Sequence, residues 1–313
     1  MKDITLKHLR YACALADHAH FGHAAEASAI SQPALSMQIK ELEERLGLPL
    51  FERGRSVRPT PFGADFIARA RRILTAVDDL GDIVQLAQGD GLRRLRLGII
   101  PTVAPYLLPR VIAALAETWP ELDLQVRETV TPRLIAELAA GQLDAAMVAL
   151  PVSEDSLTEM PLLRESFVLV RPEADADRPV PNPAQLRQMR LLLLEEGHCF
   201  RDQALAFCAM DDARPREWLD SSALSTLVQM VAAGMGVTLI PDMAVAIETR
   251  AAAVSVARFA APTPQRQIGL IWRRSSPLAG RLTAVGEAIA RFVADGNGTG
   301  ADQNSDRSPL ARS

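Results

Sequence analysis

The segment from Ser31 to Ser36, which reads Ser-Gln-Pro-Ala-Leu-Ser, constrains the fold of this chain more than any other. Ser31 is placed to cap a helix, and Pro33 falls in the first turn, where a missing N–H costs nothing. The buried stripe of this helix is expected to contain Leu35, Ile39, Leu42 and Leu46. The exposed face then carries Gln32, Pro33, Ser36, Met37 and Lys40. A small polar outer face near a helix N-terminus is typical of a major-groove reader, and the alternative is a solvated helix in a plain bundle.

Two shorter helices are expected before this one. Thr5 is a suitable N-cap, and the first stripe consists of Leu6, Leu9, Cys13 and Ala16. Cys13 should therefore face the core. An alanine-rich second helix is expected from Ala24 to Ile30. Residues 1–61 are thus predicted to form a winged helix-turn-helix that contacts DNA through Ser31, Gln32, Pro33, Ser36, Lys40, Arg53 and Arg55.

The last two residues of that set belong to a predicted hairpin from Leu50 to Thr60 with a basic tip. Arg53 and Arg55 at this tip are expected to reach phosphates or the minor groove. The net charge of the chain is −4 at pH 7, but arginines cluster locally against only Glu52 and Asp65. The cluster comprises Arg45, Arg53, Arg55, Arg58, Arg69, Arg71 and Arg72. A basic patch on an acidic protein is compatible with DNA binding.

A long helix is expected after the hairpin, from Pro61 to Gln88, and the linker domain is assigned to residues 62–90. Its near-heptad apolar stripe contains Phe66, Ile67, Ala70, Ile73, Leu74, Val77, Leu80, Val84 and Ala87. This pattern favours a partner helix and hence a dimer with paired half-sites, whereas the alternative is packing on its own domain. Gly89-Asp90-Gly91 is expected to break the helix.

Residues 91–294 alternate strand and helix patterns, which indicates a doubly wound α/β domain. Strands are expected at residues 95–100, 122–128, 145–150, 168–170, 191–194, 237–240 and 268–272, with a final helix at 278–294. Because no glycine-rich phosphate loop follows a strand, we expect no dinucleotide or other cofactor. Residues 295–313 have almost no apolar content and are expected to be a disordered tail.

Cys199 and Cys208 lie nine residues apart, in a segment that reads as a strand, a turn and a helix. In a helix, nine steps would separate them by roughly 13.5 Å along the axis and place them on opposite faces. A disulfide needs Cα atoms about 4.4–6.8 Å apart, so the pair can close only if the segment is rebuilt. Cys199 lies near the helix N-terminus, where N–H dipoles favour a thiolate, with His198 and Arg201 adjacent in sequence. The order suggests that Cys199 attacks peroxide and Cys208 resolves the sulfenic acid.

The departing hydroxide must be protonated, and His198, Asp202 and a threonine hydroxyl such as that of Thr102 are suited to relay that proton. Three other interpretations compete. In one, both cysteines are inert apolar fillers, and in another, His198 is a satisfied turn residue. A zinc site from His198, Cys199, Asp202 and Cys208 lacks the short spacings of tetrahedral ligation, so we expect no metal.

Neither a signal peptide nor an uninterrupted apolar run of about eighteen residues is found, which predicts a cytoplasmic protein without a membrane span. In that reducing compartment, the three cysteines do not indicate a structural disulfide framework.

The segment from His8 to Phe62 resembles the LysR-type regulators. The matching residues are Phe21, Ala24, Ala25, Ser31 to Ser36, Ile39, Leu42-Glu43, Leu46-Gly47, Leu50 to Arg53 and Thr60. The resemblance implies a winged helix-turn-helix, a linker dimerisation helix and a two-lobed effector domain built like periplasmic binding proteins, with homodimers commonly assembled as a tetramer.

Gly98 to Pro109, Glu195 to Ala204 and Phe207-Cys208 are similar to the hydrogen-peroxide-sensing members of that family. This second resemblance implies that Cys199 is the peroxidatic and Cys208 the resolving cysteine. It also implies supporting roles for Thr102, Thr131, His198 and Asp202 in placing peroxide, with Arg266 beside the reduced Cys199.

We therefore expect a transcription regulator, not an enzyme, that senses hydrogen peroxide through a reversible Cys199–Cys208 disulfide and controls oxidative-stress genes. Its expected partners are double-stranded promoter DNA, hydrogen peroxide, RNA polymerase and a cellular thiol reductant. Two alternatives stay open: a LysR-type regulator that binds a small metabolite between its lobes, and a thiol peroxidase with secondary DNA binding.

Overall fold

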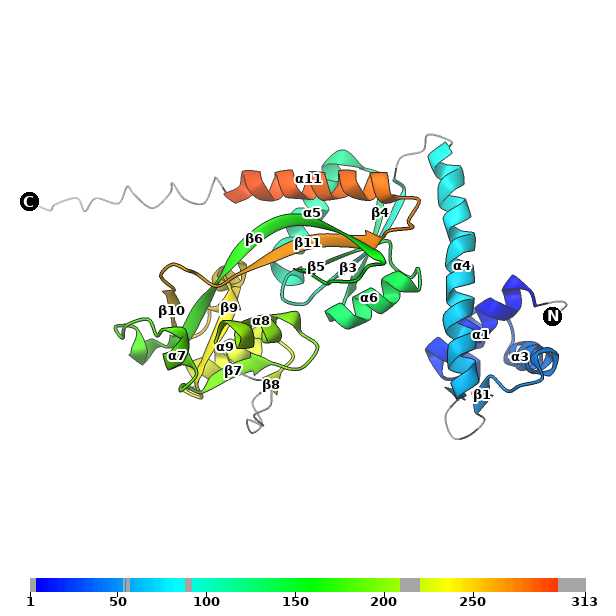
Figure 1. The fold of residues 1–313 in the computed structure, drawn as a ribbon, viewed down its shortest axis with the longest axis horizontal. Coiled ribbons are helices and arrows are strands. Elements are labelled where there is room, and N and C mark those ends of the chain that lie inside the picture. The colour runs from blue at the N-terminus through cyan, green and yellow to red at the C-terminus, as the bar shows by residue number, and fades with distance from the viewer. Residues whose placement is uncertain (1–3, 53, 55–56, 88–91, 209–219, 298–313) are drawn as a thin grey trace, which may run out of the picture. The chain divides into compact units, whose positions relative to one another are not determined.

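A computed structural model describes residues 4–52, 54, 57–87, 92–208 and 220–297. The chain divides into two compact units (Figure 1). The first contains residues 1–90 with Ala139–Gln142, and the second contains Gly91–Leu138 and Leu143–Ser313. Within the described residues, no helix is both long and apolar enough to cross a membrane.

The first unit begins with three packed helices, α1 (Leu6–His18), α2 (Phe21–Ala27) and α3 (Gln32–Leu46). Thr5 caps α1 as predicted, and Ser31 caps α3 by accepting the N–H of Ala34 at 3.4 Å. The predicted core members Cys13, Leu35, Ile39 and Leu42 are buried. Leu6, however, is 41% exposed, which contradicts the predicted stripe. The reason is that the buried face of α1 includes His8, Ala12 and Leu15 and is therefore rotated away from Leu6.

The second helix was predicted too far along the chain, because its cap is a histidine. His20 Nδ1 accepts the N–H groups of Gly22 at 3.1 Å and His23 at 3.5 Å, so α2 begins at Phe21 rather than Ala24. Histidine is not among the residues that usually cap helices. The helix ends at Ala27, and Ala29 has a left-handed φ of 53°, which excludes the predicted continuation to Ile30.

The predicted hairpin is confirmed as β1 (Phe51–Glu52) paired antiparallel with β2 (Arg58–Pro59). Arg53 and Arg55 lie outside the described residues, as does the predicted helix break at Gly89-Asp90-Gly91. The long helix α4 spans Pro61–Ala87. Ile67 and Ala70 pack into the core of this unit, but several apolar side chains farther along α4 are exposed.

The second unit contains, among the described residues, a mixed nine-stranded sheet with the order β4-β3-β5-β11-β6-β9-β7-β8 and β10 paired to β6. The strands are β3 (Arg94–Ile99), β4 (Asp123–Glu128), β5 (Ala145–Leu150), β6 (Leu157–Pro172), β7 (Leu191–Leu194), β8 (Asp220–Ser221), β9 (Val237–Pro241), β10 (Val254–Arg258) and β11 (Gln265–Arg273). Parallel pairing of β3 with β4 and β5, and of β7 with β8 and β9, forms the two lobes. The predicted two-lobed α/β fold is confirmed.

Two long antiparallel strands join the lobes, and the sequence patterns missed their length. Only residues 168–170 of β6 and 268–272 of β11 were predicted, yet the strands span 16 and 9 residues (Figure 1). Glu159, Arg164 and Glu165 interrupt the apolar pattern of β6, and β10 was not predicted at all.

The helices of this unit are α5 (Ala104–Thr118), α6 (Thr131–Ala139), α7 (Pro183–Leu186), α8 (Cys199–Phe207), α9 (Leu224–Ala232), α10 (Val245–Glu248) and α11 (Ala279–Asn297). Helix α11 packs on α5, β6 and β11, while α8 and α9 pack on the sheet of the other lobe (Figure 1). Because α11 continues to Asn297, the prediction of disorder is wrong for residues 295–297. Residues 298–313 of the predicted tail lie outside the described residues.

Candidate redox site and DNA-binding surface

Cys199 is the first residue of α8, directly after the turn that follows β7. This turn requires glycine, because Gly197 has a φ of +91°, a conformation that other residues adopt only with strain. A Cβ atom on Gly197 would lie 3.8 Å from Cγ2 of Val130, the residue before α6. The N-terminus of α6, which begins at Thr131, therefore lies beside the turn that leads to Cys199.

The two cysteines occupy opposite ends of the same helix. Cys199 is partly exposed, whereas Cys208 is fully buried and immediately follows the last residue of α8. Both are thiols. The predicted helix between them is confirmed, and nine helical steps correspond to about 13.5 Å along the axis. A disulfide between them therefore requires α8 to unwind.

His198 precedes Cys199 and is almost entirely buried, with Nε2 at 3.9 Å from Oε1 of Glu195. Burial lowers the pKa of His198, and the nearby Glu195 carboxylate only partly opposes this effect. The imidazole is therefore neutral near pH 7 and offers one nitrogen as donor and one as acceptor. His198 is thus suited to move a proton rather than to supply a positive charge beside Cys199.

Arg201 was the other residue expected to support the Cys199 thiolate. Its Nη1 donates to the carbonyl oxygen of Leu194 at 2.9 Å, which directs the guanidinium toward the end of β7. The structure does confirm the predicted position of Cys199 at the N-terminus of α8.

Arg266 on β11 is buried and links three segments of the chain. Its Nη1 donates to Thr102 Oγ1 at 2.8 Å, its Nη2 to the Thr102 carbonyl oxygen at 2.9 Å, and its Nε to Glu165 Oε1 at 2.6 Å. The guanidinium carbon also lies 5.3 Å from the ring centroid of Phe200, the neighbour of Cys199. The structure therefore brings Thr102 and Arg266 together, and it places Arg266 against Phe200, the residue that follows the candidate peroxidatic cysteine.

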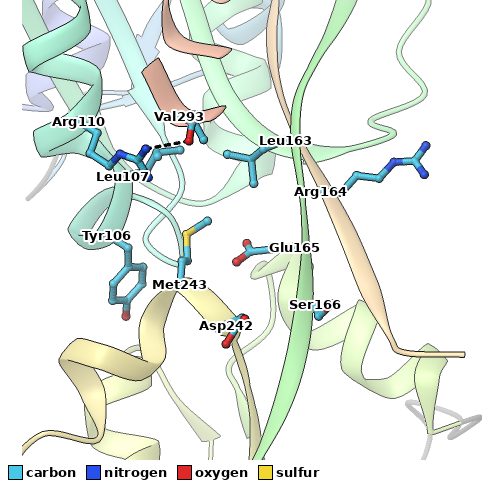
Figure 2. A pocket seen from close by; sticks show the side chains of 10 residues that line it. All are labelled: Tyr106, Leu107, Arg110, Leu163, Arg164, Glu165, Ser166, Asp242, Met243 and Val293. Carbon is cyan, nitrogen blue, oxygen red and sulfur yellow. Dashed lines mark hydrogen bonds between the residues drawn. The ribbon is translucent and has the colours of Figure 1, made fainter. Parts of the chain in front are cut away.

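Glu165 was not predicted, although it completes this arrangement. Its side chain, drawn in Figure 2, is 7% exposed. Burial raises the pKa of its carboxyl group, and the Arg266 guanidinium opposes this shift. A buried arginine requires a charged or hydrogen-bonding partner, but Arg266 stands between Gln265 and Gln267 at the start of β11, so the sequence did not show that it would be buried. Nothing local indicated which acidic residue that partner would be.

Thr131 and Asp202 are the remaining residues predicted for this site. Thr131 has a buried hydroxyl with no hydrogen-bond partner among the described residues. Asp202 is exposed in the first turn of α8, three residues after Cys199 and hence on a neighbouring part of the same helix face. Within the described part of the chain, no group of three or more His, Cys, Asp or Glu side chains is arranged to hold a metal ion.

The outer face of α3 in the first unit presents the predicted DNA-binding residues. Gln32, Pro33 and Lys40 are exposed and Ser36 is partly exposed, while Lys40 Nζ lies 3.6 Å from Glu44 Oε1. Three arginines of the predicted basic cluster pair with carboxylates on the same unit: Arg45 with Glu41, Arg69 with Asp65 and Arg71 with Asp17. The basic patch is therefore less positive than the residue count indicated.

The wing is held by residues whose structural role the sequence reasoning did not assign. Glu43 Oε1 on α3 accepts the N–H groups of Leu50 at 2.8 Å and Phe51 at 3.1 Å. Thr60 Oγ1 donates to the carbonyl oxygen of Pro49 at 2.9 Å and accepts the N–H of Gly63 at 2.9 Å. These contacts fasten both ends of the hairpin to helices α3 and α4.

Known protein families match both units. The bacterial regulatory helix-turn-helix protein model of the lysR family matches residues 6–64, and the LysR substrate binding domain matches residues 88–294. The chain belongs to the LysR family. One LysR-family relative, named a probable hydrogen peroxide-inducible genes activator of Streptomyces viridosporus, is 42% identical over 93% of this chain and 95% of its own length. Another, the DNA-binding transcriptional dual regulator OxyR of Escherichia coli K12, is 40% identical over 91% of this chain and 95% of its own.

Solved structures of LysR-family proteins agree with this assignment. A full-length OxyR variant from Pseudomonas aeruginosa superposes with a TM-score of 0.74 and 36% identity, covering 92% of this chain and 95% of its own. A hydrogen peroxide-bound cysteine-to-serine variant of OxyR from Corynebacterium glutamicum gives a TM-score of 0.62 and 34% identity, covering 94% of this chain and 96% of its own.

Proposed function

We propose that this chain is a DNA-binding transcription regulator that senses hydrogen peroxide through a reversible Cys199–Cys208 disulfide and controls oxidative-stress genes. The observation that carries the proposal is the position of the two thiols at opposite ends of α8, one partly exposed and one buried. A disulfide between them cannot form without a change in fold, so oxidation is coupled to conformation. Relatives named OxyR or hydrogen peroxide-inducible genes activator support the identity of the signal.

The chemistry balances with one peroxide per pair of thiols. The Cys199 thiolate attacks one oxygen of hydrogen peroxide, the O–O bond breaks, and the hydroxide that leaves takes up a proton to become water. The Cys208 sulfur then attacks the sulfenic acid, the S–OH bond breaks, and a second water leaves. Two thiols lose two electrons in total, and the peroxide gains them. A cellular thiol reductant reverses the reaction by exchange.

Thr102 and His198 are suited to the proton transfers. Thr102 Oγ1 accepts from Arg266, so the hydroxyl proton points away from the guanidinium and can be donated to bound peroxide. The neutral imidazole of His198, next to Cys199, can take the thiol proton and return it to the leaving hydroxide. Thr131 and Asp202 are assigned to placing peroxide, with Arg266 beside the reduced site.

Unwinding of α8 would also displace Phe200, which links the site to the rest of the lobe. The Phe200 ring packs edge-on against Phe167 of β6 with centroids 4.9 Å apart, and it faces Arg266. Since β6 crosses between the lobes, loss of this contact would alter lobe geometry and then the grip on DNA. In this scheme residues 1–61 read DNA, 62–90 dimerise, and 91–294 sense.

The proposed assembly is a homodimer that pairs through α4 and associates into a tetramer. Ile73, Leu80 and Val84 are 49%, 61% and 54% exposed, and with Val77 they follow the spacing of a heptad seam. The dimer would present two α3 helices to successive major grooves of promoter DNA, and the regulator would act on RNA polymerase there.

The test is a footprint on promoter DNA with reduced and peroxide-treated protein. Wild type and the matched control Cys13→Ser should change their footprint on treatment. Cys199→Ser and Cys208→Ser should not. A changed footprint with Cys199→Ser would refute the proposed mechanism.

A further inference from the structure

Met37 is the most exposed large apolar side chain in the part of the chain that the structure describes, at 62%. It lies on α3, two residues after Leu35 and two residues before Ile39, both of which are buried. Because two residues correspond to about 200° of rotation, Met37 points almost directly away from the core. Packing within the first unit therefore does not explain an apolar side chain at this position.

The surface neighbours of Met37 are residues already assigned to DNA contacts. Pro33 lies four residues before it and Lys40 three residues after it, so both share its face of the helix, and Ser36 is adjacent. Met37 also falls within the first two turns of α3, the part of a recognition helix that reaches base edges. The methionine is therefore continuous with the surface proposed to enter the major groove.

The two carboxylates on the same face of α3 are both paired with other side chains of the helix. Glu41 accepts from Nε2 of Gln38 at 3.2 Å and forms an ion pair with Arg45. Glu44 lies 3.6 Å from Nζ of Lys40. Both carboxylates also lie toward the C-terminal half of the helix. Their charges are thus compensated locally, and the N-terminal half of the face is open to a polyanion.

The chemistry of the methionine side chain restricts what it can read on a base pair. A thioether has no hydrogen-bond donor and only a weak acceptor, so it gains little from the amino, carbonyl and ring-nitrogen groups of base edges. The apolar group that unmodified base pairs present in the major groove is the C5-methyl group of thymine. Methionine has three rotatable bonds and adapts well to an irregular apolar surface. A thymine methyl group is therefore the base feature that fits Met37.

We propose that Met37 is a specificity-determining residue that contacts the C5-methyl group of a thymine in each half-site. The inference rests on the proposed DNA-binding function and adds a contact to it. Gln32 and Ser36 offer hydrogen bonds to base edges, whereas Met37 selects a base by its methyl group alone. Burial of one methyl group strengthens binding about fourfold per half-site, and hence about fifteenfold for a dimer on two half-sites.

The test uses reduced full-length protein and a duplex that wild type selects from a pool with a randomised central stretch. Each thymine of the selected site is replaced in turn by deoxyuridine, which lacks only the C5-methyl group. At one symmetry-related pair of positions, this replacement should weaken wild-type binding about fifteenfold and Met37→Ala binding less than about twofold. The matched control Leu48→Ala shortens another exposed apolar side chain of the first unit and should respond as wild type does. The absence of a deoxyuridine effect in wild type, or an equal effect in Met37→Ala, would overturn the proposal.

Met37→Gln tests the same contact through a change of preference. It keeps the length of the side chain but replaces the thioether by an amide, which pairs best with adenine. Selection from the same pool with Met37→Gln should yield sites that have lost thymine at that position, and the same thymine in its sites would also overturn the proposal. If wild type selects no sequence at all, the proposed DNA-reading function is itself refuted. Selection of a sequence without a methyl effect refutes the role of Met37 alone.

Discussion

Substitution of Arg266 by methionine is expected to remove a large part of the stability of the second unit. The change deletes three hydrogen bonds, to Glu165 and to two atoms of Thr102, from a guanidinium whose side chain is 0% exposed. Removing one partner of a buried ion pair costs about 3–5 kcal/mol, because Glu165 is left buried without a partner and must either stay charged or take up a proton. Against a typical unfolding free energy of about 5–15 kcal/mol, this loss is easily measured.

Urea unfolding of the reduced full-length chain provides the assay. Among the described residues, the tryptophans are Trp119 and Trp272, and both lie in the second unit, so their fluorescence reports on that unit. The double variant Arg266→Met, Glu165→Leu should recover most of the loss, since it leaves no unpaired charge. If Arg266→Met costs under about 1 kcal/mol, or if the double variant is no more stable than the single one, the reasoning about this pair is wrong.

The pH dependence of the same variant gives a second check. Burial already raises the pKa of Glu165, and loss of the guanidinium would raise it further. The folded variant then holds a proton that the unfolded chain releases above about pH 4.3. Its unfolding free energy should therefore fall as pH rises from about 5 to 8, more steeply than that of wild type. A flat profile would contradict this assignment.

Three further predictions concern other parts of the chain. Lys40→Gln should weaken binding to DNA of any sequence and reduce the slope of log K against log salt concentration by about 0.9, whereas the exposed control Lys7→Gln should change neither. If Lys40→Gln and wild type have equal slopes in a binding titration, Lys40 does not contact a phosphate. Leu80→Glu should dissociate the proposed dimer, whereas Ala68→Glu, on the opposite face of α4, should not. If sedimentation velocity gives Leu80→Glu the same mass as wild type, the dimer does not form through the apolar stripe of α4. Burial lowers the pKa of His198, so the unfolded chain binds a proton at this imidazole more readily than the folded chain does. As the pH is lowered from about 6.5, the unfolding free energy of wild type should therefore decrease, by at most about 1.4 kcal/mol per pH unit. His198→Gln should flatten this part of the profile, and an unaltered acid limb would show that His198 is not the responsible group.

Local signals predicted those parts of the fold that local chemistry determines. Ser31 and Pro33 define the start of α3 because a cap and a first-turn proline act within one helical turn. The same holds for the start of α8 at Cys199, which follows a buried strand and a glycine turn. The unusual cap at His20 shifted α2, and the charged residues of β6 concealed most of that strand.

The candidate site was predictable only in part, because its contacts are not local. Thr102 was identified from the chemistry of proton relay and from resemblance, and Arg266 from resemblance alone, but they meet across 164 residues of sequence. Glu165 pairs with Arg266 across 101 residues, and nothing near Glu165 distinguishes it from the exposed Arg164 beside it. The direction of a side chain on a strand that joins two lobes depends on register, which the apolar pattern of β6 did not specify.

The most direct measurement for the central claim is peptide mapping after one equivalent of hydrogen peroxide. Trypsin cleaves after Arg201, so Cys199 is recovered in residues 191–201, Cys208 in residues 202–216 and Cys13 in residues 11–40. Peroxide-treated protein should yield the first two peptides joined, with a mass about 2 Da below their sum. Thiol reductant should separate them again. If both peptides stay separate and their thiols unoxidised, or if Cys13 is the residue joined to Cys199, the Cys199–Cys208 switch is contradicted.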